Sequence, residues 1–417
     1  MGHLVDFILL AILGGVGCLG FYMAWNIGAN DVANSMATAV GARAITFKQA
    51  VIIAGVLTFL GATLVGSHVT ETIKGNIVDP GIVSDSHILM LGFIASLIAA
   101  SFFVTLATWK EMPISTTHAI IGALVGFGLV AGGEACINWG KLAEIAASWI
   151  LSPIVGCIFA FLVFKIIVKL IFSRQNPVES AKIVGPAIIG ATASLIVISL
   201  LINTNIGTMA GITNIYLIGG ICLCAGILTM LLSAIPFRKI KSKSSQDYQT
   251  VEMLFRKLQI GTSCFVAFSH GANDVANAIG PVAAVLSLST GNGVLNAVQA
   301  VPPALLALGG MGIALGAVTW GHRVMKTVGG RITSLTNTRG FSVDFGAATT
   351  VLLASNLGLP ISTSHTVVGA VIGVGLAKGL AAIDLGVIKK IIYSWMLTVP
   401  LAAVFSAIIF ILLRIIL

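Results

Sequence analysis

Long apolar stretches, separated by short polar connections, constrain the fold of this chain more than any other feature of its sequence. The twelve stretches lie near residues 7–25, 50–68, 88–107, 114–131, 142–172, 183–202, 215–235, 258–288, 296–321, 343–357, 361–380 and 388–417. One helical crossing of a bilayer needs about 20 apolar residues. Only 9% of the 417 residues are charged and 57% are hydrophobic, whereas a soluble domain carries about 25% charged residues. We therefore expect an all-α polytopic membrane protein with about twelve transmembrane helices.

This composition excludes several classes of protein. Too few polar side chains are present to cover a folded surface in water, which rules out soluble enzymes, nucleic-acid-binding proteins and disordered chains. An outer-membrane β-barrel is disfavoured because the apolar runs are continuous rather than alternating. The formal net charge of +9 is therefore attributed to basic residues in cytoplasmic loops, as is usual for membrane proteins.

Two motifs each occur twice in the sequence. Gly-Ala-Asn-Asp-Val-Ala-Asn occupies residues 28–34 and again 271–277, at an offset of 243. Pro-Ile-Ser-Thr-(Thr/Ser)-His occupies residues 113–118 and again 360–365, at an offset of 247. Two motifs repeated in the same order at nearly one offset indicate two homologous halves. We predict a first repeat over 4–172, a two-helix insert over 173–235, a basic linker over 236–257 and a second repeat over 258–417.

The number of spans per half predicts how the halves are oriented. Each half holds five of the apolar stretches, and an odd number requires the two copies to enter the membrane in opposite directions. With the N-terminus outside, all but three of the 23 lysines and arginines fall on the cytoplasmic side, the exceptions being Lys74, Lys141 and Arg414. This agrees with the positive-inside rule. It places both termini outside and the basic linker in the cytoplasm of a multi-pass plasma-membrane protein.

Inverted repeats of this kind are common in secondary transporters, whose substrate site lies near the midplane between the repeats. Such folds contain broken or re-entrant helices. A segment near Pro113 or Pro360 that re-enters the membrane without crossing it would change the number of spans in each half.

The first duplicated motif places a carboxylate inside strongly apolar sequence. A carboxylate at the bilayer centre costs on the order of 2.5–3.5 kcal/mol, so Asp31 and Asp274 are expected to have a function. Oxygen-only ligands suit a hard cation, and the motif surrounds the carboxylates with Asn30, Asn34, Asn273 and Asn277. The alternative is a polar contact between helices without an ion, but the duplication of all seven residues favours a cation site. We expect the helix to unwind at Gly28 and Gly271, just before each motif, and to free backbone carbonyls for the ion.

The second duplicated motif is typical of a helix start. Proline favours the first helical turn, the residue before it is extended, and Ser and Thr are preferred N-caps. Segments 113–118 and 360–365 therefore predict helices that begin at membrane depth, where free N–H groups and about half a positive charge attract an anion. The alternative is capping of a broken helix without a ligand. Three hydroxyl residues in each copy favour an oxyanion site: Ser115, Thr116, Thr117, Ser362, Thr363 and Ser364.

The remaining motif residues have simpler interpretations. His118 and His365 end the two copies, and a structural hydrogen-bonded role is favoured over a proton relay, although histidine titrates near neutral pH. The pair Gly122 and Gly126 is expected to allow close helix packing. The sequence contains no Walker loop, zinc cluster or nucleophile elbow, so we expect no enzyme activity and no cofactor.

Charge balance favours coupled transport over a channel. Neither motif contains a lysine or arginine. An oxyanion beside two ionised aspartates would bring the total to about −3 to −4, of which two helix starts offset only about +1. Two or three bound cations would bring the site near neutrality. We therefore expect obligatory cation coupling, whereas an anion channel would need a row of cationic side chains along a pore.

Together, the two duplicated motifs resemble those of the inorganic phosphate transporter (PiT) family, and the resemblance covers both halves. It implies sodium- or proton-coupled symport of inorganic phosphate by alternating access through a twelve-helix inverted-repeat fold, and it suggests a homodimer. By position, phosphate would be bound by Ser115, Thr116, Thr117, Ser362, Thr363 and Ser364. Sodium would be bound by Asn30, Asp31, Asn34, Asn273, Asp274 and Asn277. Asn26-Ile27 precedes the first motif where Ser269-His270 precedes the second, so the two cation sites are expected to differ.

Several alternatives stay open at this point. Sodium-coupled phosphate symport is the leading interpretation, and a proton-coupled carrier or a carrier of sulfate follows it, because carboxylates bind either cation and hydroxyl-lined helix starts accept either anion. An anion channel and a membrane-embedded enzyme are the other classes considered. The expected partners are inorganic phosphate, Na⁺ or H⁺ and membrane lipid, with no nucleic acid.

Overall fold

The computed structural model describes residues 2–83, 85–203, 212, 214–240, 247–290, 295, 300–328, 335–379 and 385–417. Within these ranges the secondary structure is helical, apart from one isolated antiparallel bridge between Val78 and Ile137. The first half contains α1 (Gly2–Gly41), α2 (Phe47–Val65), α3 (Ser67–Gly75), α4 (Ser86–Trp109), α5 (Thr116–Gly132), a 3₁₀ turn (Glu134–Cys136), α6 (Trp139–Ile167) and a π-helical turn (Val168–Phe172). Next come α7 (Pro177–Asn203) and α9 (Ile215–Arg238). The second half contains α10 (Asp247–Thr290), α11 (Pro303–Trp320), α12 (His322–Val328), α13 (Asn337–Asn356), α14 (Thr363–Lys378) and α15 (Leu385–Ile416).

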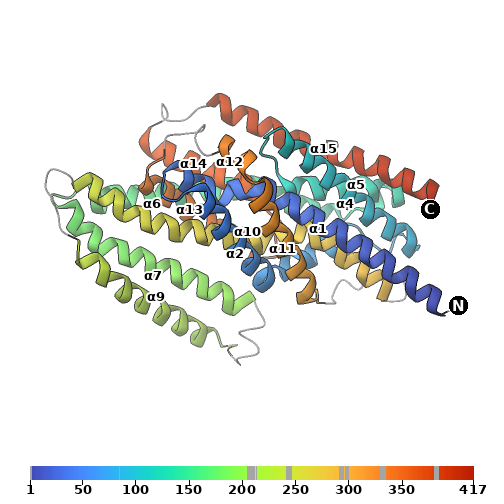
Figure 1. Ribbon diagram of the computed structural model, residues 1–417, viewed down its shortest axis with the longest axis horizontal. Helices are drawn as coiled ribbons and strands as arrows, with labels where there is room; N and C mark the ends of the chain where they lie inside the picture. The colour runs from blue at the N-terminus through green and yellow to red at the C-terminus, as the bar shows by residue number, and fades with distance from the viewer. Residues whose placement is uncertain are drawn as a thin grey trace.

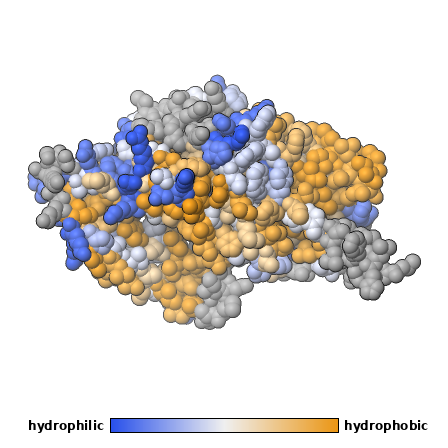
Figure 2. All heavy atoms as spheres, viewed as in Figure 1, coloured by the Kyte–Doolittle hydropathy of each residue, from blue (hydrophilic) through white to orange (hydrophobic). Residues whose placement is uncertain are grey.

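Many of these helices have the length and composition of membrane spans. Seven helical segments of the described chain are long and apolar enough to cross a bilayer, namely α2, α4, α6 with its π-helical turn, α7, α9, α11 and α15. The two longest helices, α1 and α10, have 40 and 44 residues and carry the polar Asn-Asp motif in their interiors. Hydrophobic atoms cover the surface over α15 and over α7 and α9 (Figure 2). The all-α membrane class is confirmed, whereas the count of twelve spans stays a prediction.

The helices of the two halves occur in the same order and pack across one another. α1 packs against α11 and α10 packs against α2. In the same manner α5 packs against α15, and α14 packs against α6. Both chain termini lie at one end of the molecule, and α5 and α14 lie in opposite halves of it (Figure 1). Each half is therefore completed by helices of the other half.

The insert and the start of the second half differ in one respect from the predicted boundaries. α7 and α9 pack on each other along one edge of the molecule (Figure 1), as a two-helix insert would. α10 begins at Asp247, so the predicted boundary at residue 258 falls inside this helix. Its first turns bury Val251, Leu254 and Phe255 between charged residues. Because these turns are amphipathic rather than uniformly apolar, a search for apolar stretches misses them.

The expected unwinding at the motif glycines is wrong. α1 and α10 run without interruption through Gly28 and Gly271. A Cβ atom on Gly28 would lie 1.8 Å from the carbonyl oxygen of Ile313 in α11. A Cβ atom on Gly271 would lie 2.0 Å from the carbonyl oxygen of Thr58 in α2. These glycines are therefore needed for backbone contact between helices, which is the role of small residues in membrane helix packing.

The second duplicated motif begins helices, as predicted. α5 and α14 start at Thr116 and Thr363 and have only 17 and 16 residues. At 1.5 Å per residue they span about 25 Å, less than the roughly 30 Å hydrocarbon core. Each follows a longer helix after a short loop and packs back against it, α5 on α4 and α14 on α13. These dimensions favour re-entrant hairpins over complete crossings for the segments that follow Pro113 and Pro360.

We predict that Gly28→Ala lowers the thermal unfolding midpoint of the purified protein in detergent. The added methyl group overlaps a backbone oxygen of α11 that has no rotamer to change, and overpacking of this kind costs about 1–3 kcal/mol. Gly15→Ala is the matched control, because a Cβ atom there has no heavy atom within 4 Å. Alanine is preferred over glycine inside a helix, so Gly15→Ala should leave the midpoint unchanged or raise it. Equal responses of the two variants would contradict the packing argument.

Candidate functional site

Each buried aspartate of the first motif is hydrogen-bonded to the start of one of the two short helices, α5 and α14, which we call the half-helices. Asp31 and Asp274 are both 1% exposed. The Thr116 hydroxyl donates to Asp31 Oδ2 at 2.7 Å, and the Thr363 hydroxyl donates to Asp274 Oδ2 at 3.0 Å. Thr116 and Thr363 are the first residues of α5 and α14. The structure thus joins the two duplicated motifs within each half, in the same way in both copies.

The asparagines at the end of the first motif reach across to the opposite half. Asn34 Nδ2 donates to the Ser364 hydroxyl at 2.8 Å, and Asn277 Nδ2 donates to the Thr117 hydroxyl at 3.0 Å. Asn34 also donates to Asp31 Oδ1 at 3.2 Å. Because these bonds cross between α1 and α14 and between α10 and α5, the site is built from both halves of the chain.

The asparagines that directly precede the two aspartates bind the loops that lead into α5 and α14. Asn30 Nδ2 donates to the carbonyl oxygen of Met112 at 3.1 Å, and its Oδ1 accepts from the backbone N–H of Ile114 at 3.3 Å. In the second copy, Asn273 Nδ2 donates to the carbonyl oxygen of Leu359 at 3.1 Å. Both side chains are buried. They tie each hairpin loop to the helix that carries the buried carboxylate.

The serines of the second motif are N-caps, as the sequence predicts. The Ser115 hydroxyl accepts from the backbone N–H of His118 at 3.2 Å, and the Ser362 hydroxyl accepts from that of His365 at 3.3 Å. An N-cap satisfies one of the free N–H groups of the first turn and leaves the others available. The remaining hydroxyls point to α1, to α10 or to the opposite hairpin loop, and they belong to Thr116, Thr117, Thr363 and Ser364.

The second copy offers more unused oxygens than the first. The Oδ1 atoms of Asn273, Asp274 and Asn277 are buried and have no hydrogen-bond partner in the described part of the chain. The corresponding Oδ1 atoms of Asn30 and Asp31 both accept hydrogen bonds. Carboxylate and amide oxygens suit a hard cation, so the donor set fits such an ion best around the second copy.

His270 belongs to this cluster, although the sequence analysis did not name it as a ligand. Ligand atoms of Asp31, His270 and Asp274 all lie within 4.8 Å of one another. His270 Nε2 lies 3.0 Å from Asp274 Oδ2, and the side chain is buried. The available signal was the replacement of Ile27 by His270 at matching positions before the two motifs. The difference expected between the two copies is therefore present at this position.

A third buried carboxylate, Asp344 in α13, was not predicted. It is 1% exposed and accepts hydrogen bonds from the hydroxyls of Thr38 at 2.6 Å and Ser263 at 2.5 Å. These bonds connect α13 to α1 and α10. The argument applied to Asp31, a carboxylate within an apolar stretch, also applies to Asp344 in the stretch 343–357. It was missed because Asp344 lies outside the duplicated motifs.

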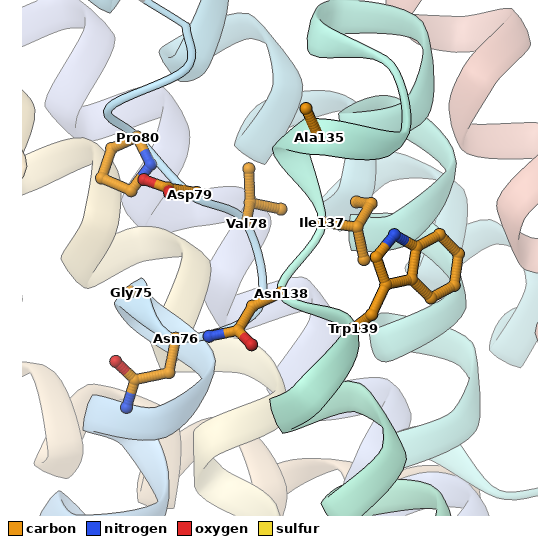
Figure 3. A pocket seen from close by; sticks show the side chains of 9 residues that line it. All are labelled: Gly75, Asn76, Val78, Asp79, Pro80, Ala135, Ile137, Asn138 and Trp139. Atoms are coloured by element: carbon orange, nitrogen blue, oxygen red, sulfur yellow. The ribbon is translucent and has the colours of Figure 1, made fainter.

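A pocket of about 460 Å³ lies apart from these residues (Figure 3). It opens between the segment after α3 and the segment that joins α5 to α6. Its lining residues are Gly75, Asn76, Val78, Asp79, Pro80, Ala135, Ile137, Asn138 and Trp139. None of them belongs to either duplicated motif, so the pocket is not part of the candidate site.

Comparison with known proteins identifies close relatives over nearly the whole chain. The profile of the "Phosphate transporter family" matches residues 27–406. A protein of Thermococcus kodakarensis, provisionally named a phosphate permease, is 52% identical over 392 residues, which cover 94% of this chain and 95% of that protein. The "Inorganic phosphate transporter 2-1, chloroplastic" of Arabidopsis thaliana is 40% identical over 423 residues, which cover 93% of this chain and 70% of that protein.

A solved structure supports the same assignment. The structure described as "The sodium-dependent phosphate transporter" is 46% identical, has a TM-score of 0.91 and covers 98% of this chain and 100% of its own. The family resemblance carried by the two motifs is thereby confirmed. The relatives are named as transporters and permeases, in agreement with the prediction that the chain is not an enzyme.

We predict that Thr116→Val lowers the thermal unfolding midpoint, because it removes a hydrogen bond to the buried Asp31 carboxylate. Hydrogen bonds to charged groups contribute about 1.5–3 kcal/mol. Thr116→Ser keeps the hydroxyl and should restore most of the stability. The control is Thr63→Val, since within the described residues the Thr63 hydroxyl bonds to the carbonyl oxygen of Phe59, one turn earlier in α2, and to no other partner. Equal midpoints for Thr116→Val and Thr116→Ser would show that the bond to Asp31 contributes nothing.

Proposed function

We propose that this chain, which belongs to the phosphate transporter family, takes up inorganic phosphate in symport with sodium ions by alternating access. The observation that carries the proposal is the contact between buried carboxylates and helix starts, Thr116 with Asp31 and Thr363 with Asp274. Cation ligands and anion-binding groups thereby share one buried site. The similarity to a structure described as a sodium-dependent phosphate transporter supports sodium as the coupling ion.

Phosphate is proposed to lie at the two half-helix starts. The free N–H groups of a first helical turn, together with the local dipole, attract an anion. Hydroxyl side chains add donors around it, from Thr116, Thr117, Thr363 and Ser364. Ser115 and Ser362 cap the two helices, so in this proposal they shape the anion site through the backbone. A helix start attracts the anion without a buried lysine or arginine side chain, which suits a site that must also release its anion.

Sodium is proposed to bind between the motif asparagines and aspartates. Two ionised carboxylates and a phosphate of one or two negative charges need about two or three cations after the helix dipoles are counted. Asp31, Asp274 and Asn277 are the central ligands, and Asn34 lies beside them. Asn273 contributes its unpaired Oδ1. Asn30 contributes by holding its hairpin loop, because both of its amide atoms are hydrogen-bonded there.

A proton-coupled carrier is the second candidate, and one observation favours it. His270 Nε2 lies 3.0 Å from Asp274 Oδ2. A protonated His270 would place one positive charge beside this carboxylate and would take over the role of one sodium ion in the charge balance. Measuring uptake with sodium and proton gradients separately distinguishes the two candidates.

The arrangement of the chain in the membrane is part of the proposal. We infer two inverted repeats over 4–172 and 247–417, separated by the α7–α9 insert. Both termini lie outside, and the basic linker lies in the cytoplasm of a plasma-membrane protein. We also infer a homodimeric assembly. Two observations support the repeats. Both termini lie at the same end of the molecule (Figure 1). In addition, α1 packs on α11 of the other half, just as α10 packs on α2. Interchange of the conformations of the two halves would then expose the central site to each side of the membrane in turn.

We predict that Asp31→Asn and Asp274→Asn each reduce sodium-driven phosphate uptake by about tenfold or more, without loss of folded protein. The amide keeps the shape of the side chain but removes a negative charge from the cation site, and about 1.4 kcal/mol corresponds to a factor of ten. Uptake of radiolabelled phosphate into proteoliposomes is the measurement. Asp85→Asn is the control, since Asp85 caps α4 at an exposed position and asparagine caps equally well. Wild-type sodium dependence in both site variants would remove these residues from the cation site.

The same proteoliposomes test the coupling ion and the anion. The proposal predicts uptake with an inward sodium gradient, little uptake with a proton gradient alone, and weak competition by excess sulfate. Full-rate phosphate uptake without sodium or a proton gradient would contradict coupled transport altogether.

A further inference from the structure

Four aromatic rings form a continuous row of ring contacts at the junction of the two half-helices; we call this row the stack, although its central pair meets edge to face. The rings of His118 and His365 lie 4.5 Å apart, centroid to centroid, at an interplanar angle of 77°. Trp149 of α6 lies 3.9 Å from His118, and Trp395 of α15 lies 3.5 Å from His365. The two histidines are only 4% and 5% exposed. In the order Trp149–His118–His365–Trp395, the first two rings come from the first half and the last two from the second, so the contact between the two histidines connects the halves.

Hydrogen bonds cross the same stack. His118 Nδ1 lies 3.4 Å from the carbonyl oxygen of Trp395, and His365 Nδ1 lies 3.3 Å from that of Trp149. A carbonyl oxygen only accepts hydrogen bonds, so Nδ1 carries the hydrogen in both rings. The carbonyl of Trp149 has no helical partner, because the residue four positions later is Pro153, which lacks an N–H group. His365 therefore supplies the donor that α6 lacks at this point.

The helices on either side of the stack are in backbone contact. A Cβ atom on Gly369 of α14 would lie 2.1 Å from the carbonyl oxygen of Pro153 in α6. A Cβ atom on Gly122 of α5 would lie 2.5 Å from the carbonyl oxygen of Val399 in α15. Such contacts leave α5 and α14 little freedom to shift sideways on their partners. The histidines extend this fixed packing up to the first turn of each half-helix.

The loops before the half-helices are held at the same junction. The Thr117 hydroxyl donates to the carbonyl oxygen of Ile361 at 3.0 Å, and the Ser364 hydroxyl donates to that of Ile114 at 3.3 Å. Trp149 Nε1 donates to the carbonyl oxygen of Pro360 at 3.1 Å. One side chain of the stack is thus bonded directly to the loop that leads into α14.

The histidines point away from the carboxylates. Thr116 and His118 are two residues apart on α5, which is about 200° around a helix with 3.6 residues per turn. Thr116 contacts Asp31 of α1, so His118 faces the opposite side, toward α6 and α15. The same spacing separates Thr363 from His365 in α14. The imidazoles are therefore not ligands of the proposed cations.

We propose that the stack Trp149–His118–His365–Trp395 sets the separation and tilt of the two half-helix starts. These four residues are positioning residues, which determine the affinity for the oxyanion without touching it. A change in this spacing moves the N–H groups and hydroxyls of both helix starts together, while the cation ligands on α1 and α10 stay in place. The inference rests on the proposed binding of phosphate at these helix starts.

The test compares variants that remove one property of the imidazole at a time. His365→Phe keeps an aromatic ring in the stack but loses the donor to the Trp149 carbonyl, and His365→Asn keeps a donor but cannot stack. His118→Phe and His118→Asn make the same pair in the other half. His87→Phe, at an exposed position near the start of α4, is the matched control. Phosphate uptake is measured in proteoliposomes over a range of phosphate concentrations, and sodium-dependent thermal stabilisation is measured in detergent without phosphate.

The proposal predicts about a tenfold or greater rise in the half-saturating phosphate concentration for the Asn variants, which remove a ring from the stack, with the maximal rate changed less than about twofold. The Phe variants, which keep the ring but lose one hydrogen bond, should fall between the Asn variants and the wild type. Sodium-dependent stabilisation should match the wild type in all four, which also shows that the proteins are folded.

Three results would overturn the inference. The first is an unchanged half-saturating concentration in both Asn variants. The second is loss of sodium-dependent stabilisation in parallel with phosphate affinity, which would indicate a general folding role. The third is unchanged phosphate affinity with lost response to a proton gradient, which would make the histidines a proton relay. Wild-type protein that takes up no phosphate would overturn the proposed function and this inference with it, whereas wild-type uptake with unaffected variants overturns the inference alone.

Discussion

The hydrogen bond between a buried aspartate and the first residue of a half-helix is the interaction on which the rest of this structure depends. Asp31 with Thr116 and Asp274 with Thr363 bring negative charge and anion-binding backbone into one place inside apolar helices. A buried carboxylate alone is costly there, and so are the unpaired N–H groups of a helix start. In the function that we propose, cations resolve the conflict, since they compensate the carboxylates and allow an oxyanion to approach. In that proposal, coupled transport follows from the charge balance rather than from any single residue.

The duplication of this interaction is nearly symmetric, and its departures from symmetry are informative. Both copies share the Asp–Thr bonds, the Asn bonds across the two halves and the Ser caps. They differ at His270, which stands where the first half has Ile27, and at Asn273, whose Oδ1 is unpaired whereas that of Asn30 accepts a hydrogen bond. A carrier built from two equivalent halves needs such differences if its cation sites are to bind unequally. The Trp–His stack provides a fixed link between the two halves.

Much of this organisation is predictable from the sequence, for physical reasons that apply to particular residues. Apolar length predicts the membrane class, and the helix starts at Thr116 and Thr363 follow from proline and serine chemistry. Three features were recognised only in the structure. The role of Gly28 depends on the approach of Ile313 in another helix, which no local pattern reveals. Asp344 has no duplicate to mark it. The first turns of α10 are amphipathic, so a search for continuous apolar stretches does not detect them. The roles assigned to the individual site residues remain proposals.

The central claim is that phosphate binds at this site only when cations neutralise the aspartates. Phosphate binding by the purified protein, measured by calorimetry at increasing sodium concentration and constant ionic strength, tests it most directly. The account predicts that phosphate affinity rises steeply with sodium and that phosphate raises sodium affinity by the same factor, since coupling between two sites is reciprocal. Phosphate affinity that stays the same when sodium is replaced by choline, at a pH where protons do not substitute, would contradict it.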